Sequence, residues 1–262
     1  RSGGLLLLLT PPREVWPTYP DPDRQRLVAQ PEEADRAGQG FISRLVRLLA
    51  EDPARDLTPA SCDITWQPLD GSRPLSADQA RALPAIHNVL HGHRRRPLVL
   101  SADRGRGKSA VLGLASADLL SRDPALTIAV TAPSHATVAT LFAHAERALA
   151  EMPERLAGLS YVSPDRVAQG DVLADLLLVD EAAAIPTPLL EAMLARHSRI
   201  VFATTEHGYE GTGRGFHLRF KRILDEQTPD WQELRLVEPI RWSLSDPLEP
   251  LIFRLLGLNA DI

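Results

Sequence analysis

The stretch LVLSADRGRGKSAVLGLA, residues 98–115, decides the fold class of this chain. It joins an apolar run to an apolar-periodic segment through a turn that contains Gly105 and Gly107. A phosphate-binding loop has the pattern G-x-x-x-x-G-K-[ST], and residues 102–109 match it except at Ala102. Because such a loop wraps backbone N–H groups round phosphate oxygens at a helix N-terminus, we predict a strand, a nucleotide-binding turn and a helix.

The side chains of this turn suit a nucleoside triphosphate with its magnesium ion. Gly105 and Gly107 permit the tight backbone that phosphate binding needs. Lys108 is expected to reach the β- and γ-phosphates, and the Ser109 hydroxyl is expected to ligate Mg²⁺. The alternative is a chance turn rich in glycine and arginine, but the flanking strand and helix favour the nucleotide site.

A second element, LLLVDEAAAIP at residues 176–186, supports this prediction. Its apolar strand ends at Asp180 and Glu181. Asp180 is expected to hold Mg²⁺ through water, and Glu181 is expected to polarise the attacking water. An Asp-Glu pair after a strand can also be an ordinary helix cap, but its place after the phosphate-binding turn favours the catalytic interpretation. The glutamate favours hydrolysis over kinase chemistry, because an attacking water needs a base. No N-K-x-D guanine motif follows the turn, which argues against a GTPase.

Short apolar runs alternate with amphipathic segments from Ser76 onward. The runs LVL, IAV, LLLV and IVF are apolar throughout, which is typical of strands covered on both faces of a parallel sheet. This alternation predicts a three-layer α/β domain with right-handed crossovers. Strands are expected within residues 97–102, 126–133, 173–182, 199–205 and 231–240, and helices within 75–92, 108–122, 136–151, 186–197 and 215–227.

The first 75 residues differ in character from this alternating region. Five leucines in GGLLLLLT, residues 3–10, favour a buried strand over a cleaved targeting segment, because the apolar run is shorter than a signal peptide or membrane helix needs. Residues 10–40 are rich in proline and charge and predict an irregular connection. Residues 40–52 have apolar side chains at helical spacing and predict an amphipathic helix.

Composition limits the possible partners. A net charge of −5 over 262 residues excludes a basic field over the whole surface, so RNA contacts must come from local patches. Two clusters are basic, HGHRRR at residues 91–96 and RGFHLRFKR at residues 214–222, and each is either a solvated face or an RNA phosphate contact. The single cysteine, Cys62, fits a reducing cytoplasm. His87, His91 and His93 have near-metal spacing, but the absence of nearby cysteine or carboxylate partners argues against zinc.

Three further positions are candidates for nucleotide contact. Gln79 has the placement of the adenine-reading glutamine of helicase-like ATPases, although spacing alone equally allows a solvated helix residue. Thr204 and Thr205 can sense the γ-phosphate at the carboxyl end of a strand, and the glycines within residues 208–215 predict a mobile switch loop. Arg241 follows the last strand, where it can touch phosphate charge or form a structural ion pair.

Several segments together resemble one family. In order along the chain, RGRGKSA, VDEAAAIPTPLL, TTEHGYEGTGRGF and PIRW…DPLE look like the ATP-dependent helicase module of tRNA(Met) cytidine acetyltransferases. The N-terminal GGLLLLL…W…PD resembles the end of that family's first domain, and the position of Ala102 is commonly not glycine in this family. The resemblance implies a RecA-like P-loop NTPase fold. It also implies acetylation of N4 of the wobble cytidine of elongator tRNA(Met) with acetyl-CoA and ATP, by an enzyme whose helicase-like module remodels or positions the tRNA.

The resemblance carries specific residues over to this chain. Asp180 and Glu181 are expected to be the Walker B pair, Ser109 and Asp180 to hold Mg²⁺, and Lys108 and Arg241 to join the acidic pair in catalysis. The expected ATP contacts are Gln79, Gly105, Arg106, Gly107, Lys108, Ser109, Ala110 and Arg241.

The expected domains are part of a smaller α/β domain with a linker at residues 1–75, the ATPase module at 76–240, and a connection at 241–262. The family's acetyltransferase domain follows that connection, so acetyl-CoA is expected only in the full-length protein. The expected partner is tRNA and not a membrane, and the oligomeric state stays open. Two alternatives remain: a scaffold that binds ATP without turnover, and a general RNA or DNA helicase. A helicase needs two RecA-like lobes, and the strands account for one.

Overall fold

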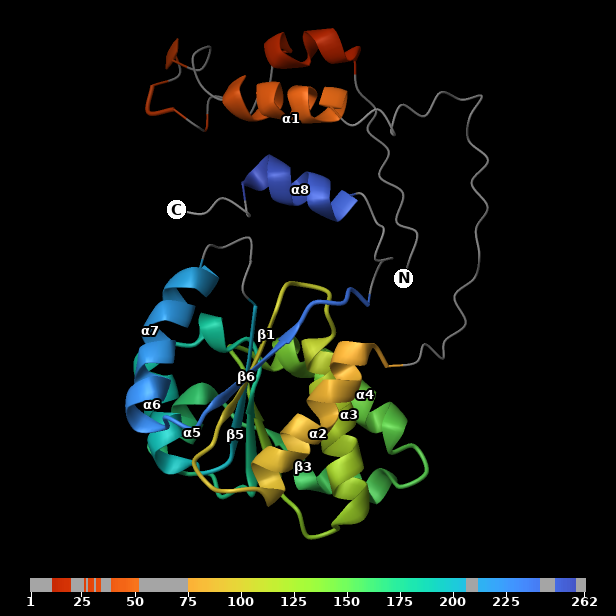
Figure 1. The fold of residues 1–262 in the computed structure, drawn as a ribbon, viewed down its shortest axis with the longest axis vertical. Coiled ribbons are helices and arrows are strands. Elements are labelled where there is room, and N and C mark those ends of the chain that lie inside the picture. The colour runs from red at the N-terminus through yellow and green to blue at the C-terminus, as the bar shows by residue number, and fades with distance from the viewer. Residues whose placement is uncertain are drawn as a thin grey trace. The chain divides into compact units, whose positions relative to one another are not determined.

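The computed structural model describes residues 11–19, 26, 28–30, 32–33, 39–51, 75–205, 212–240 and 248–257. The chain divides into two compact units (Figure 1). One comprises Arg1–Asp70 with Trp242–Ile262, and the other comprises Gly71–Arg241. The predicted leucine strand at residues 3–10 and the predicted phosphate contact Arg241 lie outside the described residues.

A six-stranded sheet forms the centre of the larger unit (Figure 1). Its strand order is β3-β2-β4-β5-β1-β6, and all five pairings are parallel. This confirms the predicted α/β class with a parallel sheet. The strands are β1 (Leu98–Ala102), β2 (Ile128–Thr131), β3 (Leu159–Tyr161), β4 (Leu176–Val179), β5 (Ile200–Thr205) and β6 (Gln232–Leu236).

Helices cover both faces of this sheet, which explains the fully apolar strands. On β1, Leu98 and Leu100 enter the core shared with the first helical layer, whereas Val99 enters the core shared with the second. The first layer contains α2 (Ala77–His91), α3 (Lys108–Arg122) and α4 (Ala139–Ala148). The second layer contains α5 (Pro164–Gln169), α6 (Thr187–Arg196) and α7 (Thr212–Gln227).

The strand β3 and the helix α5 were not predicted, and the prediction for residues 212–215 was wrong. β3 has three residues and α5 has six, so neither is long enough to show a hydrophobic period. Residues 212–215, expected in a glycine-rich loop, are the first turn of α7. The buried side chains of Phe220 and Leu224 anchor this helix on the sheet and stabilise it against its glycines. The rest of the predicted loop, residues 206–211, lies outside the described residues.

The smaller unit is described at a 3₁₀ helix, η1 (Arg13–Thr18), and at two α-helices, α1 (Gln39–Glu51) and α8 (Leu248–Leu256). The helix expected at residues 40–52 is therefore confirmed, whereas α8 was not predicted. The Arg44 guanidinium donates a hydrogen bond to the Arg254 carbonyl at 2.5 Å, which links α1 to α8. None of the helices in the described ranges is long and apolar enough to cross a membrane.

Candidate functional site

The loop between β1 and α3, residues 103–107, is shaped by two glycines with left-handed backbone. Gly105 has φ 82° and Gly107 has φ 83°, a region that other residues adopt at a cost. A Cβ at Gly107 would lie 2.4 Å from Gln79 Nε2 and 2.8 Å from Ile240 Cδ1. The loop therefore requires glycine at this position both for its conformation and for its close neighbours.

Gln79 lies beside this loop, as its predicted role requires. Ser76 is the N-cap of α2, and the side chains and backbones of Ser76 and Gln79 exchange hydrogen bonds in a capping box, both at 3.2 Å. The Gln79 amide nitrogen then donates to the Gly107 carbonyl at 3.4 Å. The amide is thus held between the start of α2 and the loop.

Lys108, the first residue of α3, is joined to Glu181 through a threonine. Lys108 Nζ donates to Thr205 Oγ1 at 2.9 Å, and Thr205 Oγ1 donates to Glu181 Oε2 at 2.9 Å. Burial lowers the pKa of Lys108, and the carboxylates of Glu181 and Asp180 partly oppose this effect. This chain of contacts connects the carboxyl ends of β1, β4 and β5, which converge at one edge of the sheet.

Asp180 is completely buried and is held by two donors. The Ser109 hydroxyl donates to its Oδ2 at 2.7 Å, and the Glu181 N–H donates to its Oδ1 at 2.9 Å. Burial raises the pKa of this carboxyl group, since the charged form is poorly solvated there. Glu181 itself has φ 47°, a left-handed conformation that is uncommon outside glycine.

The adjoining oxygens of Ser109 and Asp180 fit a magnesium ion, because Mg²⁺ is bound by carboxylate and hydroxyl oxygens with water and phosphate completing its shell. The remaining predicted contacts in this part of the chain are Arg106, which is 6% exposed in the loop, and Ala110, which is buried in α3.

The sequence interpretation missed a segment that crosses this loop, Val237–Ile240, and the residue that anchors it. Asp78 Oδ2 accepts hydrogen bonds from the backbone N–H groups of Val237 at 2.6 Å and Glu238 at 2.8 Å. The Ile240 N–H donates to the Gly105 carbonyl at 3.0 Å. Burial alone would raise the pKa of Asp78, but these hydrogen bonds and Arg81 outweigh burial and lower it. The available signal was an acid in the first turn of the helix expected within residues 75–92, and it was not used.

Comparison with known proteins supports the resemblance seen in the motifs. Residues 99–259 match the family model described as RNA cytidine acetyltransferase NAT10/TcmA, helicase domain, and residues 1–56 match tRNA(Met) cytidine acetyltransferase TmcA, N-terminal. The chain belongs to this family of enzymes. Its RecA-like sheet corresponds to the helicase domain named by the first of these matches.

Proteins named tRNA(Met) cytidine acetyltransferase TmcA are similar to this chain over most of its length. The protein from Nitrosococcus halophilus is 48% identical over 99% of the chain, and the protein from Haloferax volcanii is 36% identical over 99%. The protein from Vibrio cholerae is 47% identical over 66%. The chain covers 38%, 39% and 25% of these three proteins, so it spans well under half of their length.

Proposed function

We propose that this chain is the ATP-binding and ATP-hydrolysing helicase-like module of a tRNA(Met) cytidine acetyltransferase. The observation that carries the proposal is the convergence of three strand ends on one loop. There, Lys108, Thr205 and Glu181 form a hydrogen-bonded chain, and Ser109 contacts Asp180 beside it. Phosphoryl transfer to water needs a loop that binds phosphate, a cation, ligands for a metal ion and a base. The 103–107 loop, Lys108, the Ser109–Asp180 pair and Glu181 can supply these groups in that order.

Each residue has a defined part in the proposed hydrolysis. The N–H groups at the start of α3 bind phosphate oxygens, and Lys108 offsets their negative charge. Ser109 and Asp180 hold the magnesium ion, which supplies further positive charge beside the phosphates when it is bound. Glu181 orients the attacking water and accepts its proton. Arg241 directly follows Ile240, whose N–H bonds to the Gly105 carbonyl, and we assign it a phosphate contact.

The same proposal extends to the whole protein of which this chain is a module. ATP hydrolysis here remodels or positions elongator tRNA(Met), and a domain beyond this chain transfers the acetyl group of acetyl-CoA to N4 of the wobble cytidine. We place this activity in the cytoplasm, where the tRNA substrate resides. The support is the family membership of the chain, which spans 38% of its relative from Nitrosococcus halophilus.

One observation favours a second candidate function, a nucleotide-binding scaffold without turnover. Thr205 already donates a hydrogen bond to one carboxylate oxygen of Glu181, which reduces the capacity of this group to act as a base. In a scaffold, the contact between Lys108 and Thr205 would order the site around bound ATP without hydrolysis.

ATP turnover by the chain, with and without elongator tRNA(Met), tests the proposal. Lys108→Ala should abolish turnover, because the phosphates lose their buried cation. Arg147→Ala is the matched control, since it removes an exposed cation from α4, outside both basic clusters. Turnover that survives in Lys108→Ala would contradict the proposal, whereas ATP binding without turnover under every condition would support the scaffold.

A further inference from the structure

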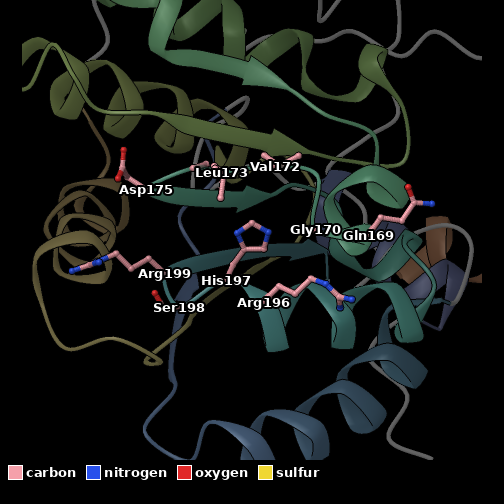
Figure 2. Close-up of a pocket in the computed structure, with 10 residues that line it drawn as sticks. Gln169, Gly170, Val172, Leu173, Asp175, Arg196, His197, Ser198 and Arg199 are labelled. Atoms are coloured by element: carbon pink, nitrogen blue, oxygen red, sulfur yellow. The ribbon is translucent and has the colours of Figure 1, made fainter.

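A pocket lies at the amino edge of the sheet, where β4 and β5 begin, opposite the carboxyl edge that carries the 103–107 loop (Figure 2). It has a volume of about 420 Å³ and is lined by residues between Gln169 and Asp175 and between Arg196 and Arg199. These segments are the α5–β4 and α6–β5 connections. Because the strands are parallel, this pocket and the 103–107 loop are separated by the length of the strands.

The pocket carries a group of nitrogen-bearing side chains from one short segment. Figure 2 shows His197 between Arg196, the last residue of α6, and Arg199 in the α6–β5 connection. The Nε2 of His197 and the Nε of Arg199 are buried, and neither has a hydrogen-bond partner within the part of the chain that the structure describes. Buried donors of this kind cost stability unless a ligand or water satisfies them.

Arg196 is positioned by a glycine. Gly170 ends α5 with φ 88°, and a Cβ at this position would lie 3.1 Å from Arg196 Nε and 3.2 Å from Arg196 Cδ. The absence of a side chain at Gly170 therefore leaves room for the arginine stem along the backbone. The guanidinium is exposed at the rim of the pocket, where its planar set of donors can bind an anion in two-point fashion.

A basic segment from a distant part of the chain adjoins this pocket. The Arg95 N–H donates to the Ser198 carbonyl at 2.8 Å, so the HGHRRR cluster, residues 91–96, lies beside the α6–β5 connection. Arg94 and Arg95 are exposed there, while Arg96 pairs with Asp230 at 3.0 Å. The edge thus gathers separate cations on a chain whose net charge is −5.

The acidic side chain of the pocket is already engaged by its own neighbours. Asp175 accepts hydrogen bonds from the backbone N–H of Thr127 at 2.9 Å and from its hydroxyl at 2.8 Å. These bonds hold the carboxylate at the start of β2 and lower its pKa, with a smaller contribution from Arg199. Arg196 donates one hydrogen bond, from Nη1 to the Ala192 carbonyl at 3.4 Å, so its other donors can meet an external anion together with the exposed Arg94 and Arg95.

We propose that this amino edge, formed by the pocket and the Arg94–Arg96 segment, binds backbone phosphates of the RNA on which the enzyme acts. The inference rests on the proposed function and adds to it a surface for the RNA. Several exposed guanidinium groups on adjoining segments suit a polymer with one negative charge per nucleotide, and phosphate contacts supply most sequence-independent affinity. Since ATP binds at the carboxyl edge, RNA and ATP occupy the module together.

Binding of labelled elongator tRNA(Met), measured by fluorescence anisotropy over a series of salt concentrations, tests this surface. The variant is Arg95→Gly/Arg196→Gln, which removes two exposed charges with little risk to folding, because Arg95 has φ 61° and glycine tolerates that conformation. We expect the affinity to fall about 10- to 100-fold near 0.1 M salt, and the slope of log K against log salt to fall by about 2. ATP binding should be unchanged.

The matched control is Arg47→Gln/Arg147→Gln, which removes two exposed charges from α1 and α4 and should leave tRNA affinity nearly unchanged. Equal losses in both variants, or none in the amino-edge variant, overturn the inference while the ATPase proposal stands. A wild-type chain that hydrolyses ATP but binds no tRNA overturns it as well. A further outcome is that inorganic phosphate stabilises the protein thermally through Arg196 while the tRNA affinity of the variant is unchanged. This outcome would assign the pocket to a free anion and would also overturn the inference.

Discussion

The two edges of the central sheet differ in how their charged groups are paired. At the carboxyl edge, Lys108, Thr205 and Glu181 bond to one another, and Asp180 is held by two donors. At the amino edge, buried nitrogens of His197 and Arg199 have no hydrogen-bond partner among the described residues. Buried hydroxyls of Ser101, Thr131 and Thr204, near the carboxyl ends of their strands, also have no partner within the described ranges. The two edges therefore differ in their charged groups: a lysine and two acids contact one another or a shared neighbour at the carboxyl edge, whereas exposed arginines predominate at the amino edge.

Both edges nevertheless use a glycine in the same way. Gly107 and Gly170 both have left-handed backbone, and each leaves room for a polar side chain, Gln79 at one edge and Arg196 at the other. The difference lies in the neighbours: a Cβ at Gly107 meets atoms at 2.4 Å and 2.8 Å, while a Cβ at Gly170 meets a flexible arginine at 3.1 Å. A side chain at Gly107 would therefore displace its neighbours further than one at Gly170.

The largest expected effect comes from Glu181→Gln, which removes the proposed base. Turnover should fall about 10²- to 10⁴-fold while ATP affinity is kept, because the amide preserves shape but accepts no proton. Glu191→Gln on α6 is the control, since this exposed side chain accepts a hydrogen bond from Gln227 and is not part of the proposed site. Steady-state ATPase assays and equilibrium ATP binding measure the two effects. Unchanged turnover would show that Glu181 is not the general base, and the proposed hydrolysis would then lack one.

Gly107→Ala should damage the carboxyl edge more than any matched change at the amino edge. The left-handed backbone alone costs about 1–2 kcal/mol, and Gln79 and Ile240 must both move. We expect ATP affinity to fall at least about 10-fold, which calorimetric titration can measure. Wild-type ATP affinity in this variant would show that the loop conformation does not matter for binding.

Asp78→Asn tests the segment that ties the end of β6 to the loop. Because hydrogen bonds to a charged group are lost, the free energy of unfolding should fall by about 1.5–3 kcal/mol, measured by urea denaturation. Asp118→Asn, in a surface ion pair with Arg122, is the control and should cost less.

The same carboxylate predicts a pH dependence. The folded-state pKa of Asp78 is lowered from its ordinary 3.8, so its stabilising contribution is present above about pH 4 and is lost as pH falls through the lowered pKa. Wild type should therefore lose more stability than Asp78→Asn between about pH 5 and about pH 2. Parallel curves of the free energy of unfolding against pH for the two proteins would show that Asp78 does not stabilise the fold through its charge.

The smallest expected effect is that of Gly170→Ala at the amino edge. The strained backbone should cost about 1–2 kcal/mol of stability, and the displaced arginine should weaken tRNA binding a few-fold with no change in ATP affinity. Thermal denaturation and anisotropy measure these effects. If Gly170→Ala lost as much ATP affinity as Gly107→Ala, the assignment of ATP binding to the carboxyl edge alone would be contradicted.

The carboxyl edge was largely predictable because its residues are contiguous in two motifs. The predicted helix at residues 108–122 coincides with α3, and the predicted acidic pair does lie beside Ser109. The last strand was predicted too long, over residues 231–240, because the N–H groups of Val237 and Glu238 bond to Asp78 and not to a neighbouring strand. Such a contact between residues about 160 positions apart leaves no local pattern.

The amino edge could not be predicted for the same reason. Its pocket is made by two connections that meet only when β4 and β5 pair. Arg95, which adjoins the pocket, lies about 100 residues from its partner Ser198. The basic run at residues 91–96 was visible in the sequence, but a charge run alone does not distinguish a solvated face from a binding site.

A structure of the chain with a non-hydrolysable ATP analogue and Mg²⁺ tests the central claim most directly. The account predicts the phosphates on the backbone N–H groups of residues 105–109, Mg²⁺ beside Ser109 and Asp180, and the adenine near Gln79. A nucleotide bound elsewhere, or phosphates that do not contact Lys108, would contradict the assignment of the carboxyl edge as the ATP site.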